Sequence, residues 1–434
     1  MGSDATVAET FRPLLRLAFG ASPPLNFEFW DGSRAPAAGQ SPGTLRIRSK
    51  DALAHMVWAP GELGLGRAFV SGSADLDGDL FAMLRALQTA VPGNARLGAA
   101  GAVRALGAAG RLGALGRRPE PPREEARPRR GRAHTRARDA AAISHHYDVG
   151  NDFYNLVLGP SMTYSCARFT APHDDGTGPA DPAVSLADAQ RAKHDLICRK
   201  LGLTPGLRLL DVGCGWGSMA IHAAATYGAQ VVGVTISREQ ADLARRRVAE
   251  AGLSANVEIR LADYRDLGGE HFDAISSIGM FEHVGSERAA EYFDTLRALL
   301  RPRGRLLNHA ISARGGSKIP PRSFIGRYVF PDGELRDVGE VVLAMERAGF
   351  EVRDVESLRE HYALTLRAWV ANLERDWPAA VALVGEGRAR IWRIYMAASA
   401  LGFEDGGLGL HQVLGVVPDE HGGAGLPGTR RAWG

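Results

Sequence analysis

The sequence is poor in cysteine and has no long uncharged apolar run. Three cysteines, Cys166, Cys198 and Cys214, stand among 434 residues without paired or metal-type spacing, which argues against a disulfide framework and a metal site. No stretch reaches the roughly 18 to 20 apolar residues of a membrane span, and the start of the chain lacks the features of a secretory signal. We therefore expect a cytoplasmic protein. Its 45% hydrophobic residues are enough for a full core.

Acidic residues are scarce between Arg96 and Arg138. This stretch has twelve arginines and three glutamates, a local net charge of +9 that leaves −6 for the rest of the chain. Such a bias is typical of a segment drawn to the inner, anionic face of a membrane, where each arginine contributes about 1 kcal/mol. A solvated linker rich in Ala, Gly, Pro and Arg has the same composition. We expect no nucleic-acid partner, because no aromatic residues are interleaved to stack on bases.

This basic segment divides the chain. We predict a small α+β domain associated with lipid or membrane over residues 1–92, a basic linker over 93–140, a larger domain over 141–417 and a flexible tail over 418–434. The stretch 11–19 of the first domain is basic and amphipathic. Such a segment either packs into a core or anchors a protein on a membrane.

A glycine-rich turn follows an apolar run in the larger domain. Residues 209–217 read LLDVGCGWG, and a helical pattern begins at Ser218. A strand that ends in alternate glycines lets a ligand lie against bare backbone. The spacing is G-x-G-x-G, with Asp211 two residues upstream, and differs from the G-x-G-x-x-G of dinucleotide sites. It resembles motif I of S-adenosylmethionine-dependent methyltransferases, in which the loop lies under the amino-acid and ribose part of the cofactor.

Alternating strand and helix patterns continue after this turn. A β-branched run at 230–237 precedes a helical pattern at 238–249, and further strand-like runs follow at 257–261 and 272–278. This order predicts an α/β fold with a doubly wound, Rossmann-like, mostly parallel sheet.

Seven stretches in order resemble the cyclopropane-fatty-acyl-phospholipid synthase family, which includes the mycolic-acid cyclopropane synthases. They extend from His146 to Leu366, about half of the chain, and such an ordered set is hard to obtain by chance. The stretches are HYDVGNDFY at 146–154, MTYSCA at 162–167, the glycine loop, VTIS at 234–237, FEHVG at 281–285, YVFPDG at 328–333 and HYALTL at 361–366.

The resemblance implies a binding site for S-adenosyl-L-methionine. The second strand departs from most methyltransferases, because it ends in Thr235-Ile236-Ser237, with Gln240 a turn later, where an acidic residue usually binds the ribose. Hydroxyl and amide groups can still satisfy the ribose. The expected cofactor-binding residues are Tyr164, Ser165, Asp211, Gly213, Gly215, Trp216, Thr235, Ser237, Gln240, Asp263 and Tyr264.

The resemblance also implies methyl transfer to a cis double bond through a carbocation, with a bound bicarbonate ion as the general base. Its expected ligands are Cys166, Glu282, His309 and Tyr362. His309 and Tyr362 can donate hydrogen bonds to an oxyanion, and Glu282 can accept one or orient His309. Taken singly, each of the four is more often structural; together, in family order, they favour a site. Aromatic candidates for stabilising a cation are Tyr147, Phe281, Tyr328, Tyr362 and Trp369.

The expected substrate is an unsaturated acyl chain of a phospholipid, and the expected product is a cyclopropane. In the family that this chain resembles, the N-terminal domain is present in the phospholipid enzymes and absent from the mycolic-acid ones. One alternative is a methylene-branched product, which a separate reductase would convert to a 10-methyl chain. A second alternative is a small-molecule N-methyltransferase. Two other classes are disfavoured: a lipid-binding protein without catalysis and an RNA methyltransferase. A second copy of this chain, in a homodimer, is a further candidate partner.

Overall fold

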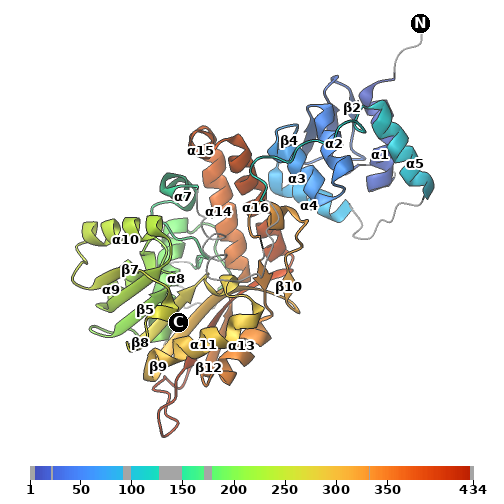
Figure 1. Cartoon of the computed structure of the whole chain (residues 1–434). Coiled ribbons are helices and arrows are strands. Elements are labelled where there is room, and N and C mark those ends of the chain that lie inside the picture. The colour runs from blue at the N-terminus through green and yellow to red at the C-terminus, as the bar shows by residue number, and fades with distance from the viewer. Residues whose placement is uncertain are drawn as a thin grey trace. The chain divides into compact units, whose positions relative to one another are not determined.

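The computed structural model describes residues 5–20, 23–90, 99–126, 149–170, 178–331 and 333–430. The chain divides into two compact units (Figure 1). The first unit is Met1–Pro128 with Pro320–Pro331 and Val384–Leu401, and the second unit is Arg129–Ile319, Asp332–Leu383 and Gly402–Gly434. Two stretches from within the predicted 141–417 domain therefore group with the first unit. The domain limits drawn from the sequence stay predictions.

A small mixed sheet with the strand order β2-β1-β3-β4 is the base of the first unit. Its strands are β1 (Asn26–Phe29), β2 (Arg34–Ala35), β3 (Gly43–Ile47) and β4 (Ala74–Gly78). In chain order, the helices that precede, separate and follow these strands are α1 (Val7–Phe19), α2 (Lys50–Trp58), α3 (Glu62–Val70), α4 (Leu80–Ala90) and α5 (Ala99–Arg111). Phe11 and Leu15 of α1 are buried with Phe27 and Phe29 of β1. The amphipathic stretch 11–19 thus packs into the core.

Helix α5 lies inside the segment that the sequence predicts to be a linker. Ala109 is buried in the core that α1 also enters, and Ala108 is buried as well. Val103 and Leu106 are instead 69% and 53% exposed. The helix therefore buries small alanines and leaves its larger apolar side chains at the surface.

A buried ion pair joins the later segments to the first unit. The Arg67 guanidinium donates to both carboxylate oxygens of Glu125 at 2.7 Å, and the Tyr328 hydroxyl donates to Glu125 at 3.1 Å. Tyr328 belongs to α12 (Phe324–Tyr328). Since a buried charge is tolerated only when it is paired and hydrogen-bonded, this network fixes how that segment packs. Tyr328, which the sequence suggested as a cation-stabilising group, is part of this network.

A seven-stranded sheet with the order β12-β13-β9-β8-β5-β6-β7 forms the centre of the second unit. Its strands are β5 (Arg208–Val212), β6 (Gln230–Thr235), β7 (Val257–Leu261), β8 (Phe272–Ile278), β9 (Leu300–Ala313), β12 (Glu351–Ser357) and β13 (Leu408–Val416). Strands β7, β6, β5, β8 and β9 pair in parallel, whereas β13 is antiparallel to β9 and β12. The predicted α/β fold with a mostly parallel sheet is confirmed.

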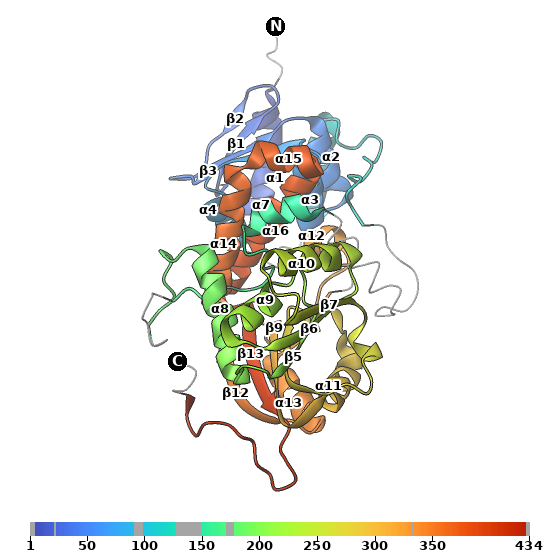
Figure 2. The same ribbon diagram turned by 90° about the vertical axis from the view of Figure 1, so that its left-hand side faces the viewer.

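Helices cover both faces of this sheet (Figure 2). One core lies under α8 (Leu186–Leu201), α9 (Ser218–Tyr227) and α10 (Arg238–Glu250). The other lies under α11 (Ala289–Ala298) and α13 (Val338–Arg347). Both faces of the central strands are thus buried, which explains why LLDV at 209–212 is apolar almost throughout.

Further elements follow outside the sheet. They are α7 (Asn151–Leu158), the short antiparallel pair β10 (Ser317–Lys318) and β11 (Glu334–Leu335), α14 (Arg359–Arg375), α15 (Trp377–Val384) and α16 (Glu386–Glu404). Among the described residues, no helix combines the length and the hydropathy needed to cross a membrane.

Candidate active site

The glycine loop lies between β5 and α9, as the sequence predicts. The amides of Gly213 and Cys214 both donate to the Val234 carbonyl at 3.0 Å, which ties the loop to β6. Gly213 and Gly215 have φ angles of 74° and 54°, which L side chains rarely adopt. A Cβ at Gly213 would lie 3.4 Å from the Met280 side chain, which lines the neighbouring pocket. The turn therefore requires glycine for its conformation, and a Cβ at Gly213 would make an ordinary contact on the side where the pocket lies.

A pocket opens at the carboxyl ends of β5, β6 and β8, the edge at which doubly wound sheets bind ligands. It encloses about 1030 Å³, part of it open to solvent. Eight of the predicted cofactor residues line it together: Tyr164, Gly213, Gly215, Trp216, Thr235, Gln240, Asp263 and Tyr264.

Three other predicted cofactor residues do not line this pocket. Asp211 is buried under the loop, accepts a hydrogen bond from Ser276 at 2.8 Å, and has its pKa raised to about 6 by burial. Ser237 caps α10 by accepting from the Gln240 amide. Ser165 is buried, and its hydroxyl accepts from Lys193 at 3.0 Å. Asp211 and Ser237 therefore shape the site from behind, through the loop and the helix start.

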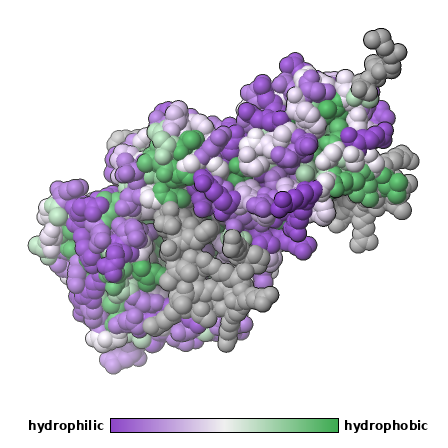
Figure 3. Space-filling view, turned by 45° about the horizontal axis from the view of Figure 1, so that its top comes forward, coloured by the Kyte–Doolittle hydropathy of each residue, from purple (hydrophilic) through white to green (hydrophobic). Residues whose placement is uncertain are grey.

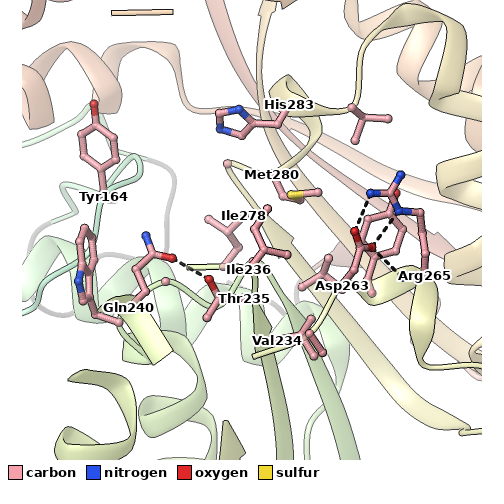
Figure 4. A pocket seen from close by; sticks show the side chains of 18 of the residues that line it. Tyr164, Val234, Thr235, Ile236, Gln240, Asp263, Arg265, Ile278, Met280 and His283 are labelled. Atoms are coloured by element: carbon pink, nitrogen blue, oxygen red, sulfur yellow. Dashed lines mark hydrogen bonds and ion pairs between the residues drawn. The ribbon is translucent and has the colours of Figure 1, made fainter. Parts of the chain in front are cut away.

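Polar groups at the end of β6 occupy the place of the usual acidic residue. The Thr235 hydroxyl donates to the Gln240 side-chain oxygen at 2.8 Å. That bond turns the Gln240 amide nitrogen toward the open part of the pocket, as Figure 4 shows. A hydroxyl and an amide are thus ready to bond hydroxyl groups of a ligand.

An ion pair and apolar side chains line the opposite side of the pocket (Figure 4). Arg265 donates to both oxygens of Asp263, at 2.9 and 2.6 Å. Ile236, although apolar, is 42% exposed at the end of β6. A flat, partly apolar ligand such as an adenine ring would cover Ile236 and lie beside the ion pair.

Sequence reasoning missed several lining residues, namely Arg265, Met280, His283 and Arg288. His283 stands inside the quoted stretch FEHVG but was given no role. Arg265 follows Asp263 by two residues, and that i, i+2 spacing was a readable signal for a local ion pair.

The predicted bicarbonate ligands are buried around β9, β13 and the start of α14. Cys166 is fully buried, burial raises the pKa of its thiol, and its sulfur is 3.6 Å from the Leu358 carbonyl. The same carbonyl accepts the Tyr362 amide in the first turn of α14. The Leu358 amide in turn bonds the Leu410 carbonyl of β13. The Cys166 side chain therefore lies at the start of α14, next to β13, where the backbone of Tyr362 forms the first turn.

Glu282 and His309 approach from the neighbouring strands. Glu282 follows β8, and one carboxylate oxygen accepts the Ile311 amide of β9 at 2.7 Å. Its other oxygen, Oε2, is buried and has no hydrogen-bond partner among the described residues. Burial raises the pKa of Glu282 to about 7. Ile311 is paired with Leu410 in the sheet, which connects Glu282 to the Cys166–Tyr362 group through a continuous series of contacts.

His309 is neutral, and one of its ring nitrogens has no hydrogen-bond partner among the described residues. It is 1% exposed, and burial holds its pKa well below the usual value. Its Nδ1 lies 3.3 Å from the Gln412 amide nitrogen on β13, whereas Nε2 is buried without a partner among the described residues. When Gln412 donates to Nδ1, the Nε2 proton is available to an acceptor. A buried donor and a buried carboxylate oxygen thus lack partners in one region, which fits a small oxyanion carrying a hydroxyl.

Aromatic rings connect this buried group to the cofactor pocket. The ring of Trp369, on α14, is centred 5.3 Å from that of Tyr164 in the pocket and 6.1 Å from that of Tyr362. Phe281 instead packs against Tyr292 and Phe293 in the core. Of the aromatic candidates drawn from the sequence, Trp369 and Tyr362 lie at the site, and Tyr147 lies outside the described residues.

Comparisons with known proteins found relatives of this chain. A family model described as mycolic acid cyclopropane synthetase matches residues 134–413. A probable fatty acid methyltransferase of Mycobacterium tuberculosis is 43% identical over 419 residues, which cover 93% of each chain. The tuberculostearic acid methyltransferase UfaA1 of the same organism is 34% identical, over 90% of this chain and 87% of that protein.

A solved structure is also similar to this chain. The mycolic acid cyclopropane synthase CmaA1, complexed with SAH and CTAB, superposes with a TM-score of 0.57 and 36% identity. The match covers 64% of this chain and 98% of that one. The two methyltransferase sequences thus extend over nearly the whole chain, whereas the cyclopropane synthase corresponds to about two thirds of it.

Proposed function

The chain belongs to the mycolic acid cyclopropane synthetase family, and we propose that it methylates the cis double bond of unsaturated acyl chains in phospholipids to give cyclopropane chains. It is an S-adenosylmethionine-dependent methyltransferase of the fatty acid methyltransferase and cyclopropane synthase group. The observation that carries the proposal is the contact series from Tyr164 through Trp369 to Tyr362, which joins the cofactor pocket to a buried polar group.

The residues around this series suit an apolar, water-free reaction. When bound, S-adenosylmethionine supplies an electrophilic methyl group. The π electrons of the alkene would form the new carbon–carbon bond as the methyl–sulfur bond breaks and S-adenosylhomocysteine leaves, and a cation would remain on the neighbouring carbon. Trp369 and Tyr362 can stabilise that cation through their ring faces, and both are buried. Exclusion of water keeps the cation from ending as an alcohol.

The second step requires a base close to the cation. Loss of a proton from the new methyl group closes the three-membered ring. Glu282 and His309 have the unpartnered atoms that would bind a bicarbonate ion as this base, with Cys166 and Tyr362 beside them. In this role the chain's own residues hold and orient the ion, whose hydroxyl would donate to Glu282 Oε2 and whose oxyanion would accept from His309 Nε2.

A phospholipid substrate is supported by the cyclopropane-fatty-acyl-phospholipid synthase of Escherichia coli, which is 39% identical over 270 residues, or 62% of this chain. Two fatty acid methyltransferases align over nearly the whole chain, first unit included. UfaA1 also favours a second candidate, in which the same methyl transfer yields a methylene-branched chain for a separate reductase, since tuberculostearic acid is a methyl-branched fatty acid. The two outcomes differ in which proton the base removes.

The test is product analysis with the full chain. The purified protein is incubated with S-adenosylmethionine and vesicles of dioleoyl phosphatidylglycerol, and the released fatty acids are analysed by gas chromatography and mass spectrometry. A product one carbon longer that resists mild hydrogenation establishes the cyclopropane. A product of the same mass that takes up hydrogen assigns the methylene route. No mass gain, despite measurable binding of S-adenosylhomocysteine, would overturn the lipid substrate and favour a small-molecule N-methyltransferase.

Helix α5 and the turn after it are the proposed membrane contact of the first unit. Val103, Leu106 and Leu115 are exposed, and Arg117 and Arg118 follow directly. Figure 3 shows apolar surface on this unit. Apolar side chains that enter the lipid interface and arginines that face anionic headgroups reinforce one another.

We expect the double variant V103E/L106E to bind anionic vesicles about tenfold or more weakly, because two apolar side chains no longer enter the interface. Cosedimentation with phosphatidylglycerol vesicles measures the effect. The control is the double variant L343E/L383E, which adds the same two charges at exposed leucines of α13 and α15 in the second unit. Equal binding of V103E/L106E and L343E/L383E would contradict this contact.

A further inference from the structure

Helix α8 carries a lysine that is completely buried and that has no role in the proposed reaction so far. Lys193 is 0% exposed, and its ammonium donates to the Ser165 hydroxyl at 3.0 Å. One turn earlier, the buried Gln190 side chain donates to the Ser165 carbonyl at 2.9 Å and to the Thr163 carbonyl at 3.4 Å. One face of α8 thus holds the segment that runs from Tyr164 in the cofactor pocket to Cys166 in the buried polar group.

The charge of Lys193 acts on the proposed bicarbonate ligands. It lowers the pKa of the Cys166 thiol against the effect of burial, and it lowers the pKa of His309. The bond to Ser165 places this ammonium beside the residue that precedes Cys166, and its charge also acts on His309 of β9. Within the described residues, no carboxylate oxygen comes within 4.0 Å of this ammonium, although Asp211 on β5 acts on it from farther away.

The proposed bicarbonate site is short of positive charge without this lysine. His309 is neutral, since burial holds its pKa well below the usual value, and Glu282 adds a carboxyl. Lys200 also acts on His309, but its ammonium is already paired with Asp354 and Glu356. A buried anion without a compensating cation is strongly disfavoured.

We propose that Lys193 is a positioning residue that supplies the buried positive charge holding the bicarbonate ion among Cys166, Glu282 and His309, while its bond to Ser165 keeps the Tyr164–Cys166 segment in place. The inference rests on the proposed function, because it assumes bicarbonate as the base. It assigns Lys193 to the affinity for the anion rather than to contact with the reacting carbons.

The pH dependence of bicarbonate binding follows from this role. Burial lowers the pKa of Lys193 to about 7, against the opposing effects of Cys166 and Asp211. The neighbouring His194, on the same helix, has its pKa held well below the usual value and stays neutral above pH 7, as does His309. Raising the pH from 7 to 9 therefore removes the positive charge from Lys193 and also removes the proton of Glu282, whose pKa burial raises to about 7, so bicarbonate affinity is expected to fall over this range.

The experiment is isothermal titration of sodium bicarbonate into the full chain saturated with S-adenosylhomocysteine, a readout independent of turnover. We expect K193M, which keeps the length but not the charge, to raise the bicarbonate Kd by about tenfold or more at pH 7. The Kd for S-adenosylhomocysteine should change by less than about threefold, since the cofactor pocket is lined by other residues. K193R should bind bicarbonate more tightly than the wild-type protein does at pH 9, because arginine stays charged and only Glu282 still loses a proton.

An unchanged bicarbonate Kd in K193M would overturn the role of Lys193 and leave the bicarbonate base intact. A loss of S-adenosylhomocysteine affinity with unchanged bicarbonate binding would also overturn it, because Lys193 would then act through Ser165 on the cofactor. No bicarbonate binding by the wild-type protein would refute the proposed base, and this inference with it. If K193M does not fold, the wild-type titration decides: a Kd that is constant between pH 7 and 9 contradicts the proposal.

Discussion

Replacing Glu282 by glutamine is expected to reduce methyl transfer by roughly 10²- to 10⁴-fold, the range of a lost general acid–base function. The Ile311 amide anchors one oxygen of this carboxylate, so the glutamine oxygen can take the same place. The other position changes from an acceptor to an NH₂ donor, which can no longer accept from the bicarbonate hydroxyl. Binding of S-adenosylhomocysteine should stay within about twofold, because Glu282 does not line the cofactor pocket.

The same E282Q variant should be more stable than the wild type at alkaline pH. The pKa of Glu282 is raised from 4.5 to about 7 by burial of its carboxylate, so the folded state favours the protonated form. The resulting stability is fully present below pH 4.5 and is lost as the pH rises through 7. A shift of this size corresponds to a difference on the order of 3 kcal/mol. Glutamine is neutral throughout and avoids the loss.

Two measurements separate these effects. Urea unfolding of both proteins at pH 5 and pH 8.5 should give a stability advantage of E282Q that is larger at pH 8.5. E291Q, at an exposed glutamate of α11, is the matched control and should alter neither turnover nor the pH dependence of stability. Full activity of E282Q with the wild-type pH dependence of unfolding would show that this carboxyl is neither catalytic nor held in a costly state.

The fold could be predicted from the sequence where the local hydrophobic pattern matches the residues that the fold buries. LLDV at 209–212 is apolar because β5 is covered on both faces, and the glycines after it have the positive φ angles that the motif demands. The alternation of strands and helices from residue 208 to 261 then leaves little choice of topology. The cofactor pocket followed from the same logic, since ends of parallel strands meet at one edge.

The parts that escaped prediction depend on contacts between distant segments. Nothing local marks Tyr328 as a partner of Glu125, about 200 residues earlier, so its place in the first unit was missed. Asp211 and Ser237 stand in the correct motifs, but their side chains point away from the pocket, into a bond with Ser276 and into a helix cap. Lys193 reads as an ordinary polar position of an amphipathic helix until the fold buries it.

Gly213→Ala is expected to weaken S-adenosylhomocysteine binding by about 10- to 100-fold, the effect of inserting a methyl group where 1–3 kcal/mol of overpacking results. The added Cβ would come within 3.4 Å of Met280, on the side where the pocket lies, so it competes with the ligand for space. Isothermal titration of S-adenosylhomocysteine measures the loss. Turnover should fall with it at low cofactor concentration and recover partly at saturation.

Gly206→Ala is the control that distinguishes the loss of ligand space from the cost of a positive φ angle at alanine. Gly206 has a φ of 85°, close to the 74° of Gly213, but nothing lies within 4 Å of a Cβ built there. Both alanine variants should therefore lose a similar stability of about 1 to 2 kcal/mol, the cost of a left-handed conformation for an L residue. Only Gly213→Ala should lose affinity.

If both variants bind S-adenosylhomocysteine as the wild type does, the ligand does not approach the backbone of this loop. An equal loss in both would mean that affinity follows overall stability and that the space above Gly213 is irrelevant. Binding lost in Gly213→Ala alone would place the ligand against the bare backbone between β5 and α9, where the alternate glycines leave room for it.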